Sequence, residues 1–180
     1  MARRDARSDP SRLKAFDTKN KNLLRVVIET PKGSRNKYAF NAKDHVYELK
    51  TVLPAGMAFP YDFGFVPSTQ GDDGDPIDVL VLMDEPAFSG CVLLCRIIGV
   101  IEGEQTEKGK KELRNDRIIA IQQDAHSWND VKTAKDLEDH FCKELEQFFT
   151  DYHKLSKTDY KVLALKGPGR ALRLIKAAKR

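Results

Sequence analysis

Apolar residues along the chain change their spacing after about residue 122. Before it they occur in short runs of strand length that are rich in Val, Ile and Leu. From Leu137 on they recur at steps of three or four, which is typical of one face of an α-helix. The pattern therefore predicts about six or seven short strands, followed by helices.

The expected strands are separated by turn residues such as the run Thr30 to Gly33. Residues 53–76 are rich in Pro and Gly, so we expect loops and turns there. The polar, Gly-containing segment 102–111 predicts a hairpin loop. The strands are expected at residues 23–29, 36–40, 45–50, 77–83, 91–101 and 117–122.

Two helices are expected in the last third of the chain. Thr133 and Asp136 have the spacing of a capping box, and Pro168 suits the first turn of a closing helix. Strands before helices predict an α+β fold that is mainly β, with a twisted antiparallel sheet closed as a small barrel and helices outside. The first helical face is formed by Leu137, Phe141, Leu145, Phe148, Phe149 and Tyr152.

Composition places the chain among ordinary globular proteins. It has 180 residues, of which 41% are hydrophobic and 32% charged, which suits a single domain with a sizeable core. We expect that domain at residues 23–180, after a mobile basic lead-in at residues 1–22. No apolar stretch has the length of a membrane span, and no apolar region follows the basic N-terminus as in a secretory signal. We therefore expect a cytoplasmic protein without a membrane partner.

Charge is divided unevenly along the chain. Residues 1–25 carry eight Lys or Arg against three Asp, and residues 166–180 carry six Lys or Arg and no acid. Because the net charge is only +4, the middle of the chain is net acidic. Basic ends can bind nucleic acid, but no nucleic-acid-binding motif accompanies them. We favour solvated ends around a cation-binding centre and expect no nucleic-acid partner.

Cysteine and histidine spacing predicts no zinc site. The three cysteines cannot all pair with one another, and no metal-binding pattern includes them or the four histidines. Cys91 and Cys95 would lie on one face of a strand as buried thiols. We take the histidines as surface or core residues.

Four aspartates, Asp72, Asp73, Asp75 and Asp78, lie within seven residues in the segment GDDGDPIDVLVL (71–82). They stand directly before a predicted buried strand. Clustered ionised carboxylates raise one another's pKa unless a cation lies among them. Hard carboxylate oxygens suit magnesium, calcium or manganese ions. The segment therefore predicts a divalent cation site.

The acidic segment has two other interpretations. A solvated acidic turn is one alternative, since Asp-Gly pairs are common in turns. A calcium loop of the EF-hand type is excluded, because Asp78 stands where that loop needs Gly and Pro76 interrupts it.

The run DGDPIDV at residues 73–79 resembles the signature of the family I soluble inorganic pyrophosphatases. The resemblance extends from about Leu24 to Tyr152, most of the chain. Other segments that are similar to the family in order and spacing are VVIETP (26–31), Lys37-Tyr38, FPYDFGFVP (59–67) and QFFTDYHKL (147–155).

The resemblance implies a small closed five-stranded OB-like barrel with flanking α-helices. It also implies Mg²⁺-dependent hydrolysis of inorganic pyrophosphate to two orthophosphates by a metal-activated water, with Mn²⁺ or another divalent cation as a substitute. Family members are often homo-oligomers. The implied roles are metal ligation by Asp73 and Asp78, with Glu29 near the metals; activation of water by Asp75; and phosphate binding by Lys37, Arg117 and Tyr152.

Several positions depart from the family pattern. The usual Lys-Tyr-Glu is Lys37-Tyr38-Ala39 here, so one carboxylate near the metals is missing. After Tyr152 the family has Lys, whereas this chain has His153, with Lys154 next as a candidate substrate-binding residue. The remaining departures are Thr51 in place of Arg, with Lys50 beside it, and Phe59 and Phe63 in place of Tyr.

The loop 102–117 departs most. The family has an Asp, then after a few residues Asp-x-Lys, whereas this chain has EGEQTEKGKKELRNDR. Arg117 takes the place of the Lys. Asp116 or Asn115 takes the second Asp position, and we favour Asp116 as a metal ligand because an ionised oxygen binds Mg²⁺ better than an amide. The candidates for the first position are Glu104, Gln105 and Glu107.

These departures leave two alternatives to a pyrophosphatase. One is a non-catalytic phosphate- or pyrophosphate-binding protein on the same scaffold, suggested by Ala39 and the missing phenol hydroxyls. The other is an OB-like module that binds single-stranded nucleic acid through the basic ends. We favour the enzyme, because the aspartates at 73, 75 and 78 are all present.

Overall fold

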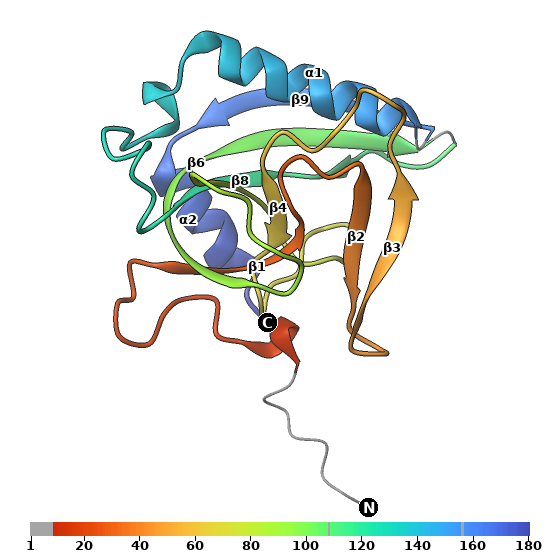
Figure 1. Cartoon of the computed structure of the whole chain (residues 1–180). Coiled ribbons are helices and arrows are strands. Elements are labelled where there is room, and N and C mark those ends of the chain that lie inside the picture. The colour runs from red at the N-terminus through yellow and green to blue at the C-terminus, as the bar shows by residue number, and fades with distance from the viewer. Residues whose placement is uncertain (1–8, 108, 156) are drawn as a thin grey trace, which may run out of the picture.

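The computed structural model describes residues 9–107, 109–155 and 157–180. Five strands close into a barrel, because they pair in the order β1-β4-β5-β8-β6 and β6 returns to pair with β1 (Figure 1). The predicted OB-like barrel is thus confirmed. The expectation of an antiparallel sheet is wrong for one pair, because β5 and β8 run in parallel. Its strands are β1 (Leu24–Thr30), β4 (Asp62–Phe65), β5 (Asp78–Leu82), β6 (Val92–Glu107) and β8 (Arg117–Gln122).

Strand β6 is longer than the sequence pattern predicts. It pairs first with β1, then with β8, and last with β9 (Thr158–Lys166) and the short β7 (Leu113–Arg114). The expected hairpin loop at 102–111 is therefore wrong over its first part. Polar residues continue the strand there because two neighbouring strands supply hydrogen bonds. The pattern also missed β9, whose pairing partner is distant in sequence.

Strand β4 corrects the prediction of loops throughout residues 53–76. All four of its residues are buried. Gly64 lies so close to β1 that an added Cβ would be 2.1 Å from the carbonyl oxygen of Val27. The glycine is therefore required by close approach of two backbones rather than by a turn.

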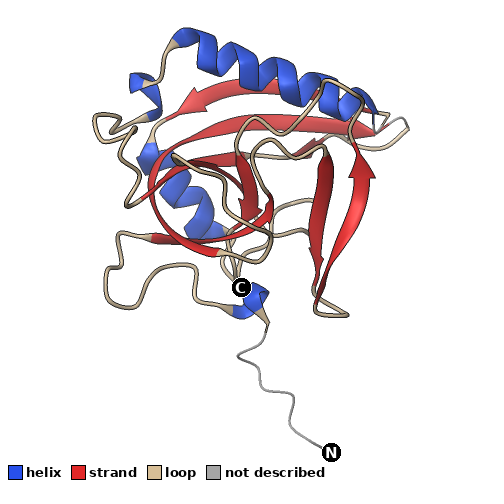
Figure 2. Ribbon diagram, in the orientation of Figure 1, coloured by secondary structure: helices blue, strands red, loops and turns tan. Residues whose placement is uncertain are grey.

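Two helices cover the outside of the barrel, as Figure 2 shows. Helix α1 (Asp139–Leu155) lies along β9, and α2 (Pro168–Ala177) packs beside β6. The predicted helical face is confirmed from Phe141 to Tyr152, whereas Leu137 precedes α1 and follows the short 3₁₀ helix η3 (Ala134–Asp136) in an extended conformation. Pro168 is at the start of α2. The capping box of Thr133 and Asp136 is present, but it caps η3 rather than α1.

Alternate residues of β5 and β8 face two hydrophobic clusters. Val79 of β5 and Ile118 of β8 belong to the cluster beneath α2, whereas Leu80 and Ile119 belong to the cluster beneath α1. This period of two, with both faces buried, explains why these strands are almost wholly apolar. The cysteines within the described residues are free: Cys95 is buried, and Cys91 and Cys142 are partly buried.

Outside the barrel, strands β2 (Asn36–Asn41) and β3 (Val46–Val52) form a separate hairpin. Residues 1–8 of the expected lead-in lie outside the described residues. In residues 9–22, Asp9 and Ala15 are buried and Phe16 pairs with Leu24 of β1. The division of the chain at residue 22 stays a prediction. Within the described residues, neither helix has the length and apolar character needed to cross a bilayer.

Candidate active site

A cavity of about 230 Å³ brings acidic and basic side chains together beside α1. Its acids come from the loop before β5 and the first residue of that strand. Its cations come from β2 and from the start of β8. The lining residues are Lys37, Phe59, Phe63, Asp73, Asp75, Asp78, Gln105, Asn115, Arg117, Phe149, Tyr152, His153 and Thr158.

The parallel pairing of β5 with β8 places acid and base side by side. Asp78 and Arg117 are each the first residue of their strand and are register partners. The Arg117 Nε atom lies 3.8 Å from Asp78 Oδ2. Because both strands are buried behind these residues, the sheet holds the two charges at the cavity wall.

The three aspartates carry more negative charge than their surroundings balance. Desolvation raises the pKa of Asp78 to about 6; Arg117 and Lys37 oppose the shift, while Asp73 and Asp75 add to it. Desolvation also raises the pKa of Asp73, and the charge of Asp75 contributes. The backbone N–H of Asp75 donates to Asp73 Oδ1 over 3.1 Å. A bound cation would relieve this repulsion.

Glu29 lies in a neighbouring cavity of about 620 Å³, which Lys37, Asp75 and Asp78 also line. Its Oε1 accepts a hydrogen bond of 2.7 Å from the backbone N–H of Phe40. Burial raises the pKa of Glu29 to about 7, and the charge of Asp78 adds to the shift. Glu29 therefore lies near the aspartates, as expected from the resemblance.

The two cations of the cavity pack against aromatic rings. Lys37 Nζ lies 5.0 Å from the ring centroid of Tyr152 and 5.9 Å from that of Phe63. Arg117 Cζ lies 4.1 Å and 4.4 Å from the ring centroids of Phe149 and Tyr160. These contacts hold the positive charges opposite the aspartates and keep them partly desolvated.

The donor set fits a hard divalent cation. Carboxylate oxygens of Asp73, Asp75 and Asp78 and amide oxygens of Gln105 and Asn115 line one cavity, and oxygen ligands are those that Mg²⁺ and Mn²⁺ prefer. Within the described residues, no three His, Cys, Asp or Glu side chains already converge as a metal-binding cluster.

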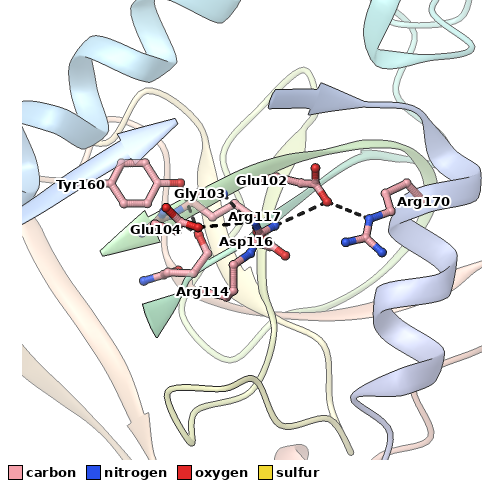
Figure 3. Close-up of polar contacts among 9 residues, drawn as sticks. Glu102, Gly103, Glu104, Arg114, Asp116, Arg117, Tyr160 and Arg170 are labelled. Carbon is pink, nitrogen blue, oxygen red and sulfur yellow. Dashed lines mark hydrogen bonds and ion pairs between the residues drawn. The ribbon is translucent and has the colours of Figure 1, made fainter. Parts of the chain in front are cut away.

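Asp116 faces a different cavity from Lys37, Arg117 and Tyr152. It lines a space of about 300 Å³ that Asp73 and Asp78 also border. Its Oδ1 accepts hydrogen bonds from the backbone N–H of Gly103 (3.0 Å) and from Arg114 Nη2 (2.7 Å). Figure 3 shows this network, in which Glu102 lies between Arg114 and Arg170.

Among the loop candidates, Gln105 and Asn115 reach the cavity. Asn115 Nδ2 donates to Gln105 Oε1 over 2.6 Å. Glu104 lies 4.0 Å from Arg114 instead, and the side chain of Glu107 lies outside the described residues. The cavity thus has two neutral amides near its carboxylates. The sequence had named both residues only as alternatives to acidic ones.

Two proposed substitutes for family residues lie away from the 230 Å³ cavity. The Lys154 side chain is 62% exposed and its Nζ lies 3.4 Å from Asp151 Oδ1. Lys50 forms an ion pair with Glu48 and borders the larger cavity of Glu29. Phe59 and Phe63 are buried, and their rings pack together with centroids 5.8 Å apart.

Sequence reasoning missed the residues that surround Arg117. His153 was expected to be an ordinary surface or core residue, but its Nε2 lies 2.9 Å from Arg117 Nη2. A signal for His153 existed, since it follows Phe149 by four residues on the same helical face. Thr158 and Tyr160 lie on the strand that the pattern missed, so nothing pointed to them.

Comparisons with known proteins agree with this site. The family model described as inorganic pyrophosphatase matches residues 26–180. The inorganic pyrophosphatase of Synechocystis sp. is 37% identical over 153 residues, covering 85% of this chain and 88% of that protein. That of Methanosarcina mazei is 36% identical over 154 residues, covering 86% and 88%.

Solved structures give the same result. The inorganic pyrophosphatase from Thermus thermophilus superposes with a TM-score of 0.85 at 29% identity, covering 94% of this chain and 96% of that one. The enzyme from Neisseria gonorrhoeae gives a TM-score of 0.81 at 32% identity, covering 92% and 94%. The barrel, the acidic strand entrance and these similarities together show that the chain belongs to the inorganic pyrophosphatase family.

Proposed function

We propose that this protein hydrolyses inorganic pyrophosphate to two orthophosphates and uses Mg²⁺ to do so. The observation that carries the proposal is the cavity in which Asp73, Asp75 and Asp78 face Lys37 and Arg117. A substrate with several negative charges needs cations around it, and its hydrolysis needs an activated water. The cavity provides groups for both tasks.

The aspartates serve the metal and the water. Asp73 and Asp78 would hold Mg²⁺, with Glu29 close by. When bound, Mg²⁺ neutralises pyrophosphate charge and lowers the pKa of water. Asp75 lies at the same cavity, where its carboxylate accepts a proton from the attacking water or orients it.

Lys37 and Arg117 form the cationic wall of the cavity, and this wall would bind the phosphates. Lys37 and Arg117 donate hydrogen bonds to phosphate oxygens, and the Tyr152 hydroxyl adds another donor. Charge-assisted hydrogen bonds of this kind are the stronger ones, and they stabilise charge on the departing phosphate. Asp116 stays a candidate metal ligand through the cavity it shares with Asp73 and Asp78. Lys154 is left out, because its ammonium group is paired with Asp151 outside the cavity.

A phosphate-release assay with pyrophosphate and Mg²⁺ tests the proposal. Asp75→Asn should lower turnover by about a hundredfold or more, because the amide cannot accept the proton. Asp130→Asn is the matched control, since Asp130 is exposed and lines none of the three cavities. Absence of turnover in the wild-type protein, or unchanged turnover in Asp75→Asn, would reject the proposal.

The amide pair of Gln105 and Asn115 and the methyl group of Ala39 favour a second candidate, a non-catalytic pyrophosphate-binding protein. Fewer carboxylates would hold fewer metal ions. Calorimetry with pyrophosphate and Mg²⁺, followed by a phosphate assay of the same sample, separates the two. Binding without phosphate release would identify the binding protein.

Three further expectations belong to this proposal. The metal preference for Mg²⁺ over Mn²⁺ is tested by repeating the assay with each ion. The homo-oligomer agrees with the exposed apolar side chains of Val46, Leu49 and Val52 on β3, and sedimentation would measure it. A cytoplasmic location agrees with the free cysteines, and the lack of a nucleic-acid partner stays an expectation.

A further inference from the structure

Arg117 is almost wholly enclosed by the protein. The residue is 2% exposed, and its guanidinium lies between the rings of Phe149 and Tyr160. Two of its nitrogens meet protein acceptors: Nη1 donates to the carbonyl oxygen of Asn115 (3.4 Å), and Nη2 lies 2.9 Å from His153 Nε2. The side chain is therefore restricted in both translation and rotation.

The hydrogen-bond chain beyond Arg117 determines the tautomer of His153. The Thr158 hydroxyl donates its one proton to the carbonyl oxygen of His153 over 3.1 Å. The same hydroxyl, 2.9 Å from His153 Nδ1, must therefore accept the Nδ1–H. That leaves Nε2 without a proton, and it accepts from Arg117.

Ring packing keeps this chain in place. The His153 and Tyr160 rings stack with centroids 4.7 Å apart and an interplanar angle of 12°. Tyr160 in turn lies against Gly103 of β6, where an added Cβ would be 2.1 Å from the Tyr160 hydroxyl oxygen. Residues of β6, β8, β9 and α1 thus form one packed unit around the guanidinium.

Neutrality of the imidazole agrees with this geometry. Burial lowers the pKa of His153 to about 3, and the charges of Arg117 and Lys37 contribute. Those two cations and the rings of Tyr152 and Tyr160 face it from α1 and the neighbouring strands, and the aspartates at 73, 75 and 78 line the same cavity. A neutral imidazole can accept from Arg117, whereas an imidazolium would repel it.

We propose that His153 and Thr158 are positioning residues that hold the Arg117 guanidinium in its orientation toward the cavity. The proposal rests on the proposed function, in which Arg117 binds a phosphate group. Two of the five N–H groups of Arg117 are committed to Asn115 and His153. The N–H of Nε is buried without a hydrogen-bond partner among the described residues and lies 3.8 Å from Asp78 Oδ2. The N–H groups left on Nη1 and Nη2 are those that would meet phosphate oxygens, and their direction is set before the substrate arrives.

Kinetics of two His153 variants test the proposal. His153→Gln keeps an acceptor near the position of Nε2, whereas His153→Leu removes it at similar volume. We expect kcat/KM to fall by about tenfold to hundredfold in His153→Leu and to stay within about threefold of wild type in His153→Gln. In an Arg117→Ala background the same Leu substitution should have almost no further effect.

Nuclear magnetic resonance of ¹⁵N-labelled histidine gives a readout without turnover. In the wild type, one imidazole should show the Nδ1–H tautomer and remain neutral at pH 5. The His153→Gln spectrum assigns that signal. Thr158→Val should alter the tautomer, and Thr158→Ser should preserve it.

Two results would overturn the inference. One is full activity in His153→Leu beside an active wild type, which would leave the proposed function intact. The other is a His153 signal that titrates normally or shows the Nε2–H tautomer. An inactive wild type with the expected spectrum would instead reject the proposed function and support the local arrangement. If the thermal transition shows that His153→Leu does not fold, the spectrum of Thr158→Val tests the inference instead. An unaltered His153 tautomer in that variant would overturn it.

Discussion

The two walls of the cavity differ in how far neighbouring groups of the protein balance their charge. Lys37 and Arg117 form the cationic wall, and Asp73, Asp75 and Asp78 form the acidic wall. On the cationic wall, Arg117 has two ring contacts and two hydrogen-bond acceptors. On the acidic wall, Asp78 is 26% exposed and has its pKa raised to about 6 by desolvation and by neighbouring acids. The guanidinium of the cationic wall is held in place by protein contacts in the folded chain, whereas the acidic wall is left with unbalanced negative charge.

This difference indicates how the fold divides the work. The aromatic and hydrogen-bonding residues that hold Arg117 come from elements packed in the core. Its guanidinium is therefore already oriented when the substrate binds, and little conformational entropy is lost there on binding. The acidic wall stands at the entrance of β5, where Asp73 and Asp75 lie in an exposed loop. Its charges are destabilising until a cation balances them, which couples metal binding to stability.

Substituting Asp78→Asn should break the acidic wall and have the largest effect. We expect turnover to fall by about a thousandfold. Thermal stability without divalent ions should rise, because a neutral amide removes repulsion with the neighbouring aspartates, and the stabilisation by added Mg²⁺ should shrink. Thermal melts with and without Mg²⁺, with Asp130→Asn as control, measure this. A lower melting temperature in the metal-free variant would contradict it.

Lys37→Met tests the cationic wall at its less enclosed member. Methionine keeps an apolar stem against Tyr152 and Phe63 but removes the charge, so we expect kcat/KM to fall by about tenfold to hundredfold with the fold intact. Lys43→Met, in the exposed turn between β2 and β3, is the matched control. Equal activity of the two variants would show that Lys37 does not contact the substrate.

Acid should lower the stability of the folded chain through His153, which contacts Arg117 of the cationic wall. The pKa of His153 is about 3 in the folded chain, against the usual value of about 6.5 in the unfolded chain. Between these two values the imidazole is protonated in the unfolded chain but not in the folded chain. The free energy of unfolding therefore decreases as the pH falls from about 6.5 toward 3. At pH 5 this loss amounts to about 2 kcal/mol.

Urea unfolding of His153→Gln at pH 7.5 and pH 5 measures that contribution. The variant should lose less stability between the two values than the wild type does. His140→Gln, at an exposed position of α1, is the control and should behave as the wild type. The explanation fails if both variants show the same acid dependence.

Lys154→Ala should have the smallest effect and sharpens the boundary of the cationic wall. Because its ammonium group lies beside Asp151 outside the cavity, we expect kcat/KM to change by less than about twofold, a small effect that is usual for an exposed ion pair. A tenfold loss in the same phosphate-release assay would return Lys154 to the site.

Much of the candidate site could be predicted from local sequence. Asp73, Asp75 and Asp78 are close in sequence and precede a buried strand, so their proximity needs only the strand to form. Asn115 and Gln105 could be named only as alternatives, because they stand ten positions apart along the chain and nothing local pairs them. Their meeting at 2.6 Å depends on the hairpin formed by β6 and β7.

The sequence by itself determined the strand and helix periods and the acidic entrance of β5, because each depends on neighbours along the chain. Only the tertiary structure decided that Gly64 allows β4 to approach β1, that β6 continues through Glu107, and that His153 and Thr158 hold Arg117. The physical reason is that hydrogen-bond partners and packing contacts from distant segments lend stability that local pattern does not contain.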